Sequence, residues 1–361
     1  MNDSDKLQQI RARIDDLDRR IQELINERAR CAQEVARVKA DAGEEGSFYR
    51  PEREANILRE IQARNRGPLS DEEIARLFRE IMSACLALEE KLEVAFLGPE
   101  GTFTQEAALK HFGHSVGTVS LASIDEVFRE VASGAAHYGV VPVENSTEGV
   151  VSHTLDLFLQ STLRICGEVL LRIHDHLLVR EGGMEDIRRV YSHQQSFAQC
   201  REWLDTHLPL AERIAVSSNA EAARLASGEA GAAAIAGDAA GRIYGLTALA
   251  SNIEDDPDNT TRFLVIGRQE VLPCGHDKTT LLVSGSNRSG LLHDLLGPLA
   301  RNGISMTRLE SRPSGRGLWE YVFFIDIEGH AQDARVATAI AEMEQEASLL
   351  KVLGSYPRAV L

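Results

Sequence analysis

The apolar residues near the start of the chain recur at the spacing of a long packed helix. Five of them follow one another at intervals of four and three positions: Ile10, Ile14, Leu17, Ile21 and Leu24. This alternation is the period of a coiled-coil seam, which packs against another helix. The seam continues at Cys31, Val35 and Val38. We therefore expect one long helix with a packing partner along one face.

Two shorter helices are expected before residue 91. A proline at the favourable first-turn position opens the segment 51–64, and the sequence SDEE supplies the third helix with an N-cap and an acidic first turn. The third helix is expected to turn five side chains inward: Ile74, Leu77, Ile81, Cys85 and Leu88. One long helix and two short ones cannot enclose a core alone. We therefore predict that residues 1–91 form an all-helical domain that dimerises.

The overall composition restricts the class of protein. A chain of 361 residues should fold as two or three domains. Its formal net charge of −16 argues against a general nucleic-acid or membrane-surface role. Five widely spaced cysteines without a CxxC pair are typical of reduced cytosolic proteins, and no leader or membrane-length apolar run is visible. We expect a soluble cytoplasmic protein whose anion sites gather positive charge locally.

Beyond residue 91, strand and helix patterns alternate. Residues 92–268 have the pattern of an α/β domain, in which strand segments such as HYGVVPV alternate with helical segments such as SIDEVFREVAS. We expect a division within it at the glycines of 181–183. A polar linker follows at 269–278. Residues 279–361 then show the order βαββαβ, which is that of a ferredoxin-like α+β domain.

Arg28 interrupts the apolar seam of the first helix. A guanidinium at a packed position is costly unless an anion or a hydrogen-bonding partner meets it, so either a structural salt bridge or a buried anion site is expected. Lys39 lies eleven residues further on nearly the same face, about 16 Å along the helix. Long side chains from both positions could converge on one small anion. Arg11 falls on another face and would point towards a partner chain.

The set Arg11, Arg28, Lys39 and Arg53–Glu54 resembles the all-helical chorismate mutases over residues 5–91. These are intertwined dimers in which the first-helix arginine reaches the other subunit's site. The resemblance implies that Arg11 and Arg28 hold the two carboxylates of chorismate. It also implies that Lys39 donates to the ether oxygen and that Glu54 accepts from the substrate hydroxyl. A Claisen rearrangement suits such a site, because it needs a folded substrate and fixed cations rather than a nucleophile or metal.

Two positions depart from the pattern of that family. The family often has Asp where this chain has Arg50, and many members have Gln where it has Glu89. If Glu89 faces the ether oxygen, it must be protonated to donate a hydrogen bond. The mutase activity is therefore expected to fall as the pH rises.

Four polar segments stand at strand ends or turns of the α/β region, where open sheets place ligands: GPEGTFT at 98–104, VPVENSTEG at 141–149, YSHQQS at 191–196 and TTRF at 260–263. By themselves Thr261 and Arg262 could be an ordinary strand edge with a capping charge. Together the four segments resemble the prephenate dehydratases across residues 93–268. That family has two α/β lobes like a periplasmic binding protein, and Thr-Arg-Phe is its most characteristic signature.

This second resemblance assigns roles to the polar segments. It implies that Thr261 presents its hydroxyl to the ring hydroxyl of prephenate, by positioning and hydrogen bonding rather than as a strong acid. Arg262 would organise the site or pair with a substrate carboxylate. The other implied cleft residues are Thr102, Glu144, Asn145, Ser192, His193 and Gln195. The family commonly has Pro where this chain has Gln194, which we expect to affect loop stiffness.

No metal or cofactor is expected in either site. The cluster His174-Asp175-His176 would place both histidines on one face of a strand, but no third ligand is apparent, so we assign it a packing or surface role. No GxGxxG follows any expected strand, which argues against a fused nicotinamide-dependent dehydrogenase.

The ferredoxin-like region contains two further signals. Gly290 stands at a strand–helix turn, where a ligand can approach the backbone closely, although a plain turn would have the same sequence. The sequence ESRP follows at 310–313. This combination resembles the ACT domain, which pairs between chains and binds amino acids, in its phenylalanine-responsive form. The implied effector residues are Gly290, Leu291, Leu292, Glu310, Ser311, Arg312 and Pro313.

Together the resemblances imply a bifunctional enzyme of phenylalanine biosynthesis. It would rearrange chorismate to prephenate, convert prephenate to phenylpyruvate, and be inhibited by phenylalanine as a homodimer or larger homo-oligomer. The alternative is a non-catalytic or monofunctional aromatic-acid sensor with the same two-lobed middle and ACT end. Such a sensor would need neither Arg28 and Lys39 on a helical seam nor Thr261.

Overall fold

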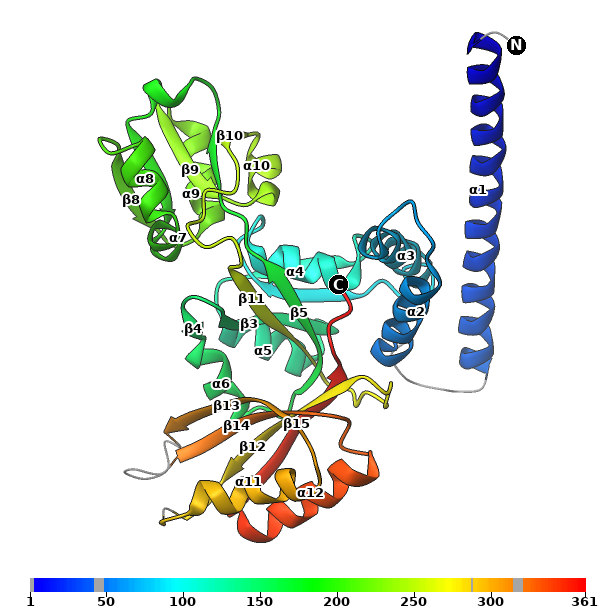
Figure 1. Cartoon of the computed structure of the whole chain (residues 1–361), viewed down its shortest axis with the longest axis vertical. Coiled ribbons are helices and arrows are strands. Elements are labelled where there is room, and N and C mark those ends of the chain that lie inside the picture. Colours follow the sequence, from blue (N-terminus) through cyan, green and yellow to red (C-terminus); the bar gives the residue numbers. More distant parts are fainter. Residues whose placement is uncertain (1–2, 42–48, 287, 314–320) are drawn as a thin grey trace.

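The computed structural model describes residues 3–41, 49–286, 288–313 and 321–361 of the chain. Figure 1 shows the N-terminal helices on one side, a two-lobed body in the middle, and a small sheet with its helices at the bottom. The predicted fold class is confirmed: an all-α part, a two-lobed α/β part and a ferredoxin-like α+β part follow one another. No described helix is both long and apolar enough to span a bilayer.

The described residues of the N-terminal part form three helices: α1 (Asp3–Asp41), α2 (Pro51–Arg64) and α3 (Asp71–Leu86). As expected, α2 begins at the proline, and Ser70 caps α3 by accepting a hydrogen bond from the Glu73 backbone N–H. The two short helices pack around a small buried cluster of Leu58, Ala75 and Met82.

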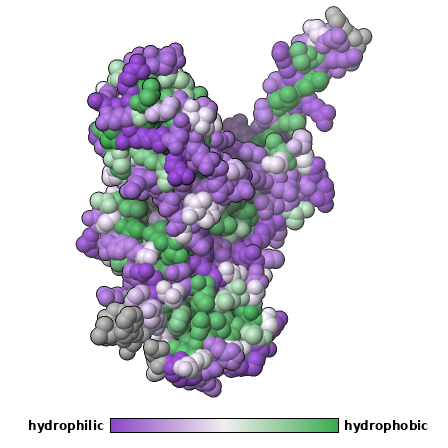
Figure 2. Space-filling model, turned by 60° about the vertical axis from the view of Figure 1, so that its left-hand side comes forward, coloured by the Kyte–Doolittle hydropathy of each residue, from purple (hydrophilic) through white to green (hydrophobic). Residues whose placement is uncertain are grey.

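The long helix α1 projects beyond the rest of the helical part. Its 39 residues make it roughly 58 Å long, and Figure 2 shows apolar residues along its projecting length. The five residues of the predicted seam are between 42% and 63% exposed. Within the described part of the chain nothing covers them, so the seam is available to a partner outside the chain.

The buried face of α3 differs from the predicted one. Leu77 and Leu88 are exposed, whereas Arg79 and Ser83 are buried. The reason is that α3 packs on more than its two fellow helices α1 and α2. It also meets the next domain, where Arg79 donates to the backbone carbonyls of Lys110 and His111. The buried face of α3 therefore includes polar residues such as Arg79 and Ser83, which a prediction from apolar residues alone does not find.

The first lobe of the middle part is a sheet with the order β2-β1-β3-β11-β5, to which β4 adds beside β3. Its strands are β1 (Glu93–Leu97), β2 (Gly117–Leu121), β3 (Tyr138–Asn145), β4 (Gly149–Val150), β5 (Arg164–Arg172) and β11 (Thr260–Gly267). Its helices are α4 (Phe103–Phe112), α5 (Ile124–Ser133) and α6 (Ser152–Phe158). β1 runs parallel to β2 and β3, whereas β11 returns antiparallel between β3 and β5. The signature strand β11 therefore lies inside a sheet formed mainly by much earlier residues.

The second lobe is a sheet with the order β10-β6-β9-β7-β8. Its strands are β6 (His176–Val179), β7 (Arg189–His193), β8 (Glu212–Val216), β9 (Ala232–Ala236) and β10 (Thr247–Ala250). Its helical segments are η1 (Met184–Asp186), α7 (Gln194–Gln199), α8 (Arg201–His207), α9 (Asn219–Gly228) and α10 (Asp238–Tyr244). Alanines from α9 and β9 share one buried cluster, because small side chains allow the helix to lie close to the strand.

Two crossings join the lobes, at residues 173–175 and 251–259. The expected division at 181–183 is wrong, because those glycines lie between β6 and η1 within the second lobe. Glycine permits a tight turn there, whereas the true crossings contain no glycine.

The C-terminal part confirms the predicted βαββαβ order. Its elements are β12 (Asp277–Ser284), α11 (Leu291–Arg301), β13 (Met306–Pro313), β14 (Tyr321–Glu328), α12 (Ala334–Glu346) and β15 (Leu349–Pro357). The sheet order is β13-β14-β12-β15, and α11 and α12 lie together on one side of it (Figure 1). The sequence pattern predicts the third strand of this part over residues 318–327, of which 318–320 lie outside the described residues. At Gly354 the edge strand β15 approaches β5 so closely that a Cβ atom would lie 2.2 Å from the Ile165 carbonyl oxygen.

Candidate functional sites

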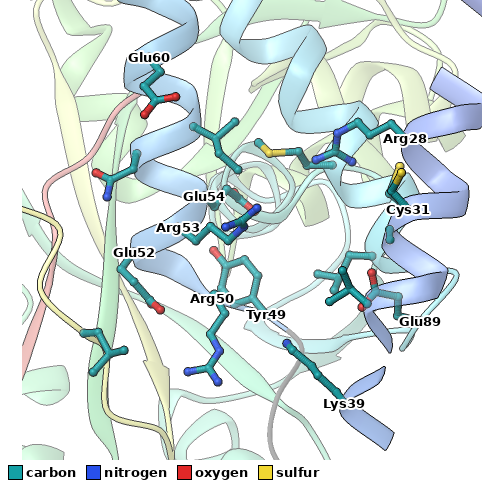
Figure 3. Close-up of a pocket in the computed structure, with 18 residues that line it drawn as sticks. Arg28, Cys31, Lys39, Tyr49, Arg50, Glu52, Arg53, Glu54, Glu60 and Glu89 are labelled. Atoms are coloured by element: carbon teal, nitrogen blue, oxygen red, sulfur yellow. The ribbon is translucent and has the colours of Figure 1, made fainter. Parts of the chain in front are cut away.

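A cavity of about 1040 Å³ lies between α1 and the pair α2 and α3. Figure 3 shows charged side chains entering it from α1, from α2 and from the end of α3. The lining cations are Arg28, Lys39, Arg50 and Arg53, and the lining carboxylates are Glu52, Glu54, Glu60 and Glu89. The fold therefore brings together five of the six residues predicted for the helical site, although they are spread over positions 28 to 89 of the sequence.

Arg28 lines this cavity. The side chain is half-buried, and among the described residues no ion pair joins it to an Asp or Glu. A half-buried guanidinium in this state can still bind an anion. Of the two interpretations left open by the sequence, the anion site is therefore favoured over the structural salt bridge.

Two carboxyl groups in this cavity have displaced pKa values. Burial raises the pKa of Glu54, against the opposing effects of Arg79 and Arg28, and Arg79 lies 3.4 Å from the carboxylate. Burial also raises the pKa of Glu89, against the opposing effects of Lys39 and Arg28. A raised pKa favours the protonated form of Glu89, which can donate a hydrogen bond.

Arg11 is the one predicted residue of this site that the chain does not bring to its own cavity. It is exposed, and it lies seventeen residues before Arg28, about 25 Å along the same helix. Its prediction as a contributor to another subunit's site stays a prediction.

Tyr49 and Glu52 line the same cavity but were missed by the sequence analysis. Tyr49 is buried, and its hydroxyl lies 3.0 Å from Nε2 of His111 on α4. Their only sequence signal was their position beside Pro51, at the start of the helix that carries Arg53 and Glu54.

A second cavity, of about 650 Å³, lies between the two α/β lobes. It contains five of the predicted cleft residues: Thr102, Asn145, His193, Gln195 and Thr261. Among the described residues that line it there is no lysine or arginine. The helices α4 and α9 both begin at this cavity, next to Thr102 and Ser218. Because helix N-termini attract anions, they supply the local positive potential that an anion site requires.

The Thr261 hydroxyl is held in a defined orientation. Asn145 Oδ1 accepts from the backbone N–H groups of Thr147 and Glu148, which fixes its amide so that Nδ2 points to β11. Nδ2 then donates to Thr261 Oγ1 at 2.8 Å and to Asn259 Oδ1 at 2.9 Å. Within the described residues no acceptor takes the Thr261 hydroxyl proton, so that proton remains available to a ligand in the cavity.

The structure places Glu144 and Arg262 away from the cavity. Thr261 pairs with Asn145 and Arg262 with Glu144 in the β11–β3 register, and successive strand residues point to opposite faces. Arg262 Nε donates to Glu168 at 2.9 Å, and its Nη1 lies 2.6 Å from Asp326 of the C-terminal part. The predictions that Arg262 pairs with a substrate carboxylate and that Glu144 is a cleft residue are therefore wrong. Both residues belong to a charge cluster at a domain boundary. The other predicted role of Arg262, organising the site, stays a prediction.

Ser192 also lies outside the cavity. It is fully buried, and its hydroxyl lies 3.2 Å from Asn219 Oδ1, which also accepts the His193 backbone N–H. The prediction of Ser192 as a cleft residue is corrected to a supporting position beneath Asn219. Asn219, which lines the cavity beside Ser196 and Ser218, was missed because it reads as an ordinary helix start.

The two histidines of the His174-Asp175-His176 cluster hold the lobe crossings together. His174 Nδ1 lies 2.8 Å from Glu254, and His176 Nδ1 accepts the backbone N–H of Asn252. Asp175 between them is buried, and desolvation with the nearby Glu254 charge raises its pKa to about 7. The contacts are those of packing, in line with the role assigned from the sequence.

In the C-terminal part, the two predicted effector segments lie at the same end of the sheet. Ser284, before the turn to Gly290, pairs with Val322, and Val322 pairs with Arg312 on its other side. Gly290 has φ of 82°, a backbone conformation that favours glycine, and it precedes α11. The Arg312 guanidinium forms two hydrogen bonds with Asp156 of α6, at 3.1 and 2.8 Å.

Family models match three consecutive stretches of the chain. A model described as chorismate mutase type II matches residues 10–90, one described as prephenate dehydratase matches residues 94–271, and one described as ACT domain matches residues 279–345.

Full-length relatives combine the same three parts. A protein of Stutzerimonas stutzeri named bifunctional chorismate mutase/prephenate dehydratase is 61% identical, with 100% of both chains covered. A protein of Pseudomonas aeruginosa with the same name is 60% identical, again with 100% of both chains covered. Among solved structures, prephenate dehydratase from Arthrobacter aurescens in complex with L-Phe is 37% identical with a TM-score of 0.69, covering 74% of this chain and 90% of that one.

Proposed function

The chain belongs to the bifunctional chorismate mutase/prephenate dehydratase family, and from this we propose which cavity and which residues carry each reaction. The protein is a two-activity enzyme of phenylalanine biosynthesis that rearranges chorismate and dehydrates prephenate. We assign the rearrangement to the cavity between α1, α2 and α3, and the dehydration to the cleft between the lobes. The observation that carries the assignment is the contrast in their linings. The first cavity contains four cations together with four carboxylates, whereas the described lining of the second contains hydroxyls, amides and a histidine but no lysine or arginine.

The cationic cavity suits a Claisen rearrangement of a dicarboxylate. In this step the ether C–O bond breaks as a new C–C bond forms within one molecule, so no group is transferred to or from the protein. Arg28 and the partner subunit's copy of Arg11 would hold the two carboxylates. Lys39 and Glu89 would stabilise charge developing on the ether oxygen, while Glu54 accepts from the hydroxyl.

Replacing Glu89 with glutamine is expected to flatten the pH profile of the mutase reaction. Because burial raises the pKa of Glu89, the protonated donor is present at low pH and is lost as the pH rises through that pKa. The native activity should therefore fall with rising pH, whereas the side-chain amide of the Glu89→Gln variant would remain a donor throughout. Initial rates of chorismate consumption between about pH 5 and pH 9 measure this, and a flat profile in the native enzyme would contradict the role of Glu89.

The neutral cleft suits the loss of carboxylate and hydroxide from prephenate. The bond to the carboxylate carbon breaks to release carbon dioxide, and its electron pair enters the ring. The C–O bond of the ring hydroxyl breaks at the same time, and the departing hydroxide takes a proton from solvent to leave as water. Aromatisation drives the step, so modest assistance is sufficient. Thr261, held by Asn145, would donate its hydrogen bond to the departing hydroxyl. The N-termini of α4 and α9 would receive the substrate's carboxylates.

Phenylalanine is proposed as the effector of the C-terminal domain. Support comes from the ACT family match, from the relative solved with L-Phe, and from the shared sheet end of Gly290 and the 310–313 segment. Arg312 joins this end to α6 of the dehydratase domain, so an effector bound there could change the position of that helix. A typical coupling of this kind is ~1–3 kcal/mol.

Replacing Gly290 with alanine is expected to weaken phenylalanine inhibition while leaving the uninhibited dehydratase rate unchanged. The φ of 82° strains any side chain, and the turn that presents its backbone to an effector would shift. The measurement is the phenylalanine concentration that halves phenylpyruvate formation. Equal inhibition of the variant and its parent would count against the assignment.

A homodimer is proposed through α1. The exposed seam needs a helix partner, and a second copy would bring Arg11 to the cavity that lacks it. Sedimentation of the full-length enzyme tests this, since a monomer with full mutase activity would contradict the shared site.

The two activities are tested together by ultraviolet absorbance with chorismate as the only substrate. Chorismate should be consumed and phenylpyruvate should then appear, without added metal or nicotinamide. A non-catalytic sensor would bind aromatic acids without consuming chorismate, so the same trace separates the two functions.

A further inference from the structure

The last four residues of the sequence, Arg358–Leu361, leave the C-terminal domain and lie on the helical domain; we call them the C-terminal segment. In Figure 1 the chain passes from the end of β15 towards α2 and α3. Arg59 of α2 donates to the carbonyl oxygens of Arg358 and His276, at 3.0 and 3.2 Å. On the other side, the Ala359 backbone N–H donates to Glu168 of β5 at 3.3 Å. The segment is thus held between two domains.

The apolar end of this segment packs on the core of the helical domain. Val360 and Leu361 lie against the cluster of Leu58, Ala75 and Met82, together with Ile57 and Phe78. Leu58 and Ala75 have no exposed surface. The C-terminal segment therefore completes the small core that joins α2 to α3, although it belongs in sequence to the end of the regulatory domain.

The same small core forms part of the wall of the cationic cavity. Ile57 and Met82 line that cavity, and both also belong to the apolar group that includes Val360 and Leu361. Glu54 stands between the cavity and a second hollow, of about 30 Å³, whose other wall includes Val360 and Leu361. One turn of α2 therefore carries a proposed substrate contact and, on its rear face, the contact with the segment.

We propose that Val360 and Leu361 are positioning residues for the mutase reaction, which hold the Ile57–Met82 wall and α2 where Arg53 and Glu54 can meet the substrate. The proposal rests on the assignment of the rearrangement to this cavity. A reaction that depends on a folded substrate conformation is sensitive to small displacements of the wall, since misplacement by about 1 Å can lower a rate by about 100-fold. Neither residue touches the cleft between the lobes, so the dehydratase reaction should not depend on them.

The test is a full-length variant with both Val360→Ala and Leu361→Ala. The expected result is a mutase kcat lowered about tenfold or more, with the kcat for added prephenate unchanged within about twofold. The number of sites that bind a non-reacting dicarboxylate analogue of chorismate should stay at one per chain, which separates a misaligned site from a partly unfolded domain. The pair Val360→Ile and Leu361→Met, which keeps the bulk, should restore most of the mutase rate.

A matched control removes an equally large leucine elsewhere. Leu210 is 97% exposed in the second lobe, so Leu210→Ala should change neither rate. An unchanged mutase kcat in the Val360→Ala and Leu361→Ala variant would overturn the proposal, and so would a loss of analogue sites in proportion to the lost rate. The Arg28→Ala variant, assayed in parallel, tests the location of the mutase site independently of the role of Val360 and Leu361. If that variant retained mutase activity, the assignment of the mutase reaction to this cavity would fail.

Discussion

Replacing Thr261 with valine is expected to lower dehydratase turnover by about 100-fold or more, the usual effect of removing a fixed hydrogen-bond donor from a reaction centre. Valine keeps the shape of threonine and removes only the hydroxyl. Asn145 would lose one acceptor but keep its bond to Asn259, so the cleft should retain its form. The measurement is the rate of phenylpyruvate formation from added prephenate.

Thr261→Ser is the matched control, because serine retains the hydroxyl at the same Cβ. We expect it to keep most of the activity, with a moderate loss due to its freer rotamer. If valine and serine variants were equally active, the hydroxyl would have no part in the departure of water. If both were equally inactive, the hydroxyl alone would not be sufficient, because serine retains it, and the methyl contact would be required as well.

Replacing Arg28 with alanine is expected to lower mutase turnover by about 100- to 1,000-fold, while prephenate added to the same protein is dehydrated at the native rate. The guanidinium faces a large cavity without a protein counter-ion among the described residues, so its removal should cost substrate binding and charge stabilisation rather than protein stability. Chorismate consumption and phenylpyruvate formation, measured separately on one preparation, test both halves of this expectation.

Two further variants serve as controls for the Arg28→Ala experiment. Arg28→Lys keeps the charge but loses the two-pronged geometry, so an intermediate rate is expected. Arg30→Ala removes an exposed arginine of the same helix that does not line the cavity, so the mutase rate should stay unchanged. Equal losses in the Arg28→Ala and Arg30→Ala variants would point to a general effect of charge on α1 and would contradict a specific site.

The periodic parts of the fold were predictable from the sequence. α2 begins and ends at the expected residues, and the βαββαβ order of the last domain is confirmed, because apolar periodicity and capping residues act locally. The face of α3 and the division of the lobes were not predictable in this way. Arg79 is buried by a contact with α4 of another domain. The lobe crossings contain no glycine, and the single proline among them does not distinguish them from other loops.

The same distinction between local patterns and contacts across domains applies to the site residues. Arg28 and Lys39 were recognisable because a charge on an apolar seam violates the local pattern, and the fold places both at the cavity. Arg262 and Glu144 were placed on the wrong face, although strand alternation next to Thr261 and Asn145 already contained the information. The true partners of Arg262, Glu168 and Asp326, come from distant strands. Contacts between residues of different domains depend on how the domains pack, and the sequence pattern around a single residue does not predict them.

The most direct test of two separate active sites is to analyse the products that the Thr261→Val protein forms when it is supplied with chorismate alone. If the rearrangement and the dehydration occupy separate pockets of one chain, prephenate should accumulate in amounts equal to the chorismate consumed, at the native mutase rate, with almost no phenylpyruvate. Should chorismate consumption stop as well, or should phenylpyruvate form at the native rate, the division of labour between the helical cavity and the interlobe cleft would be contradicted.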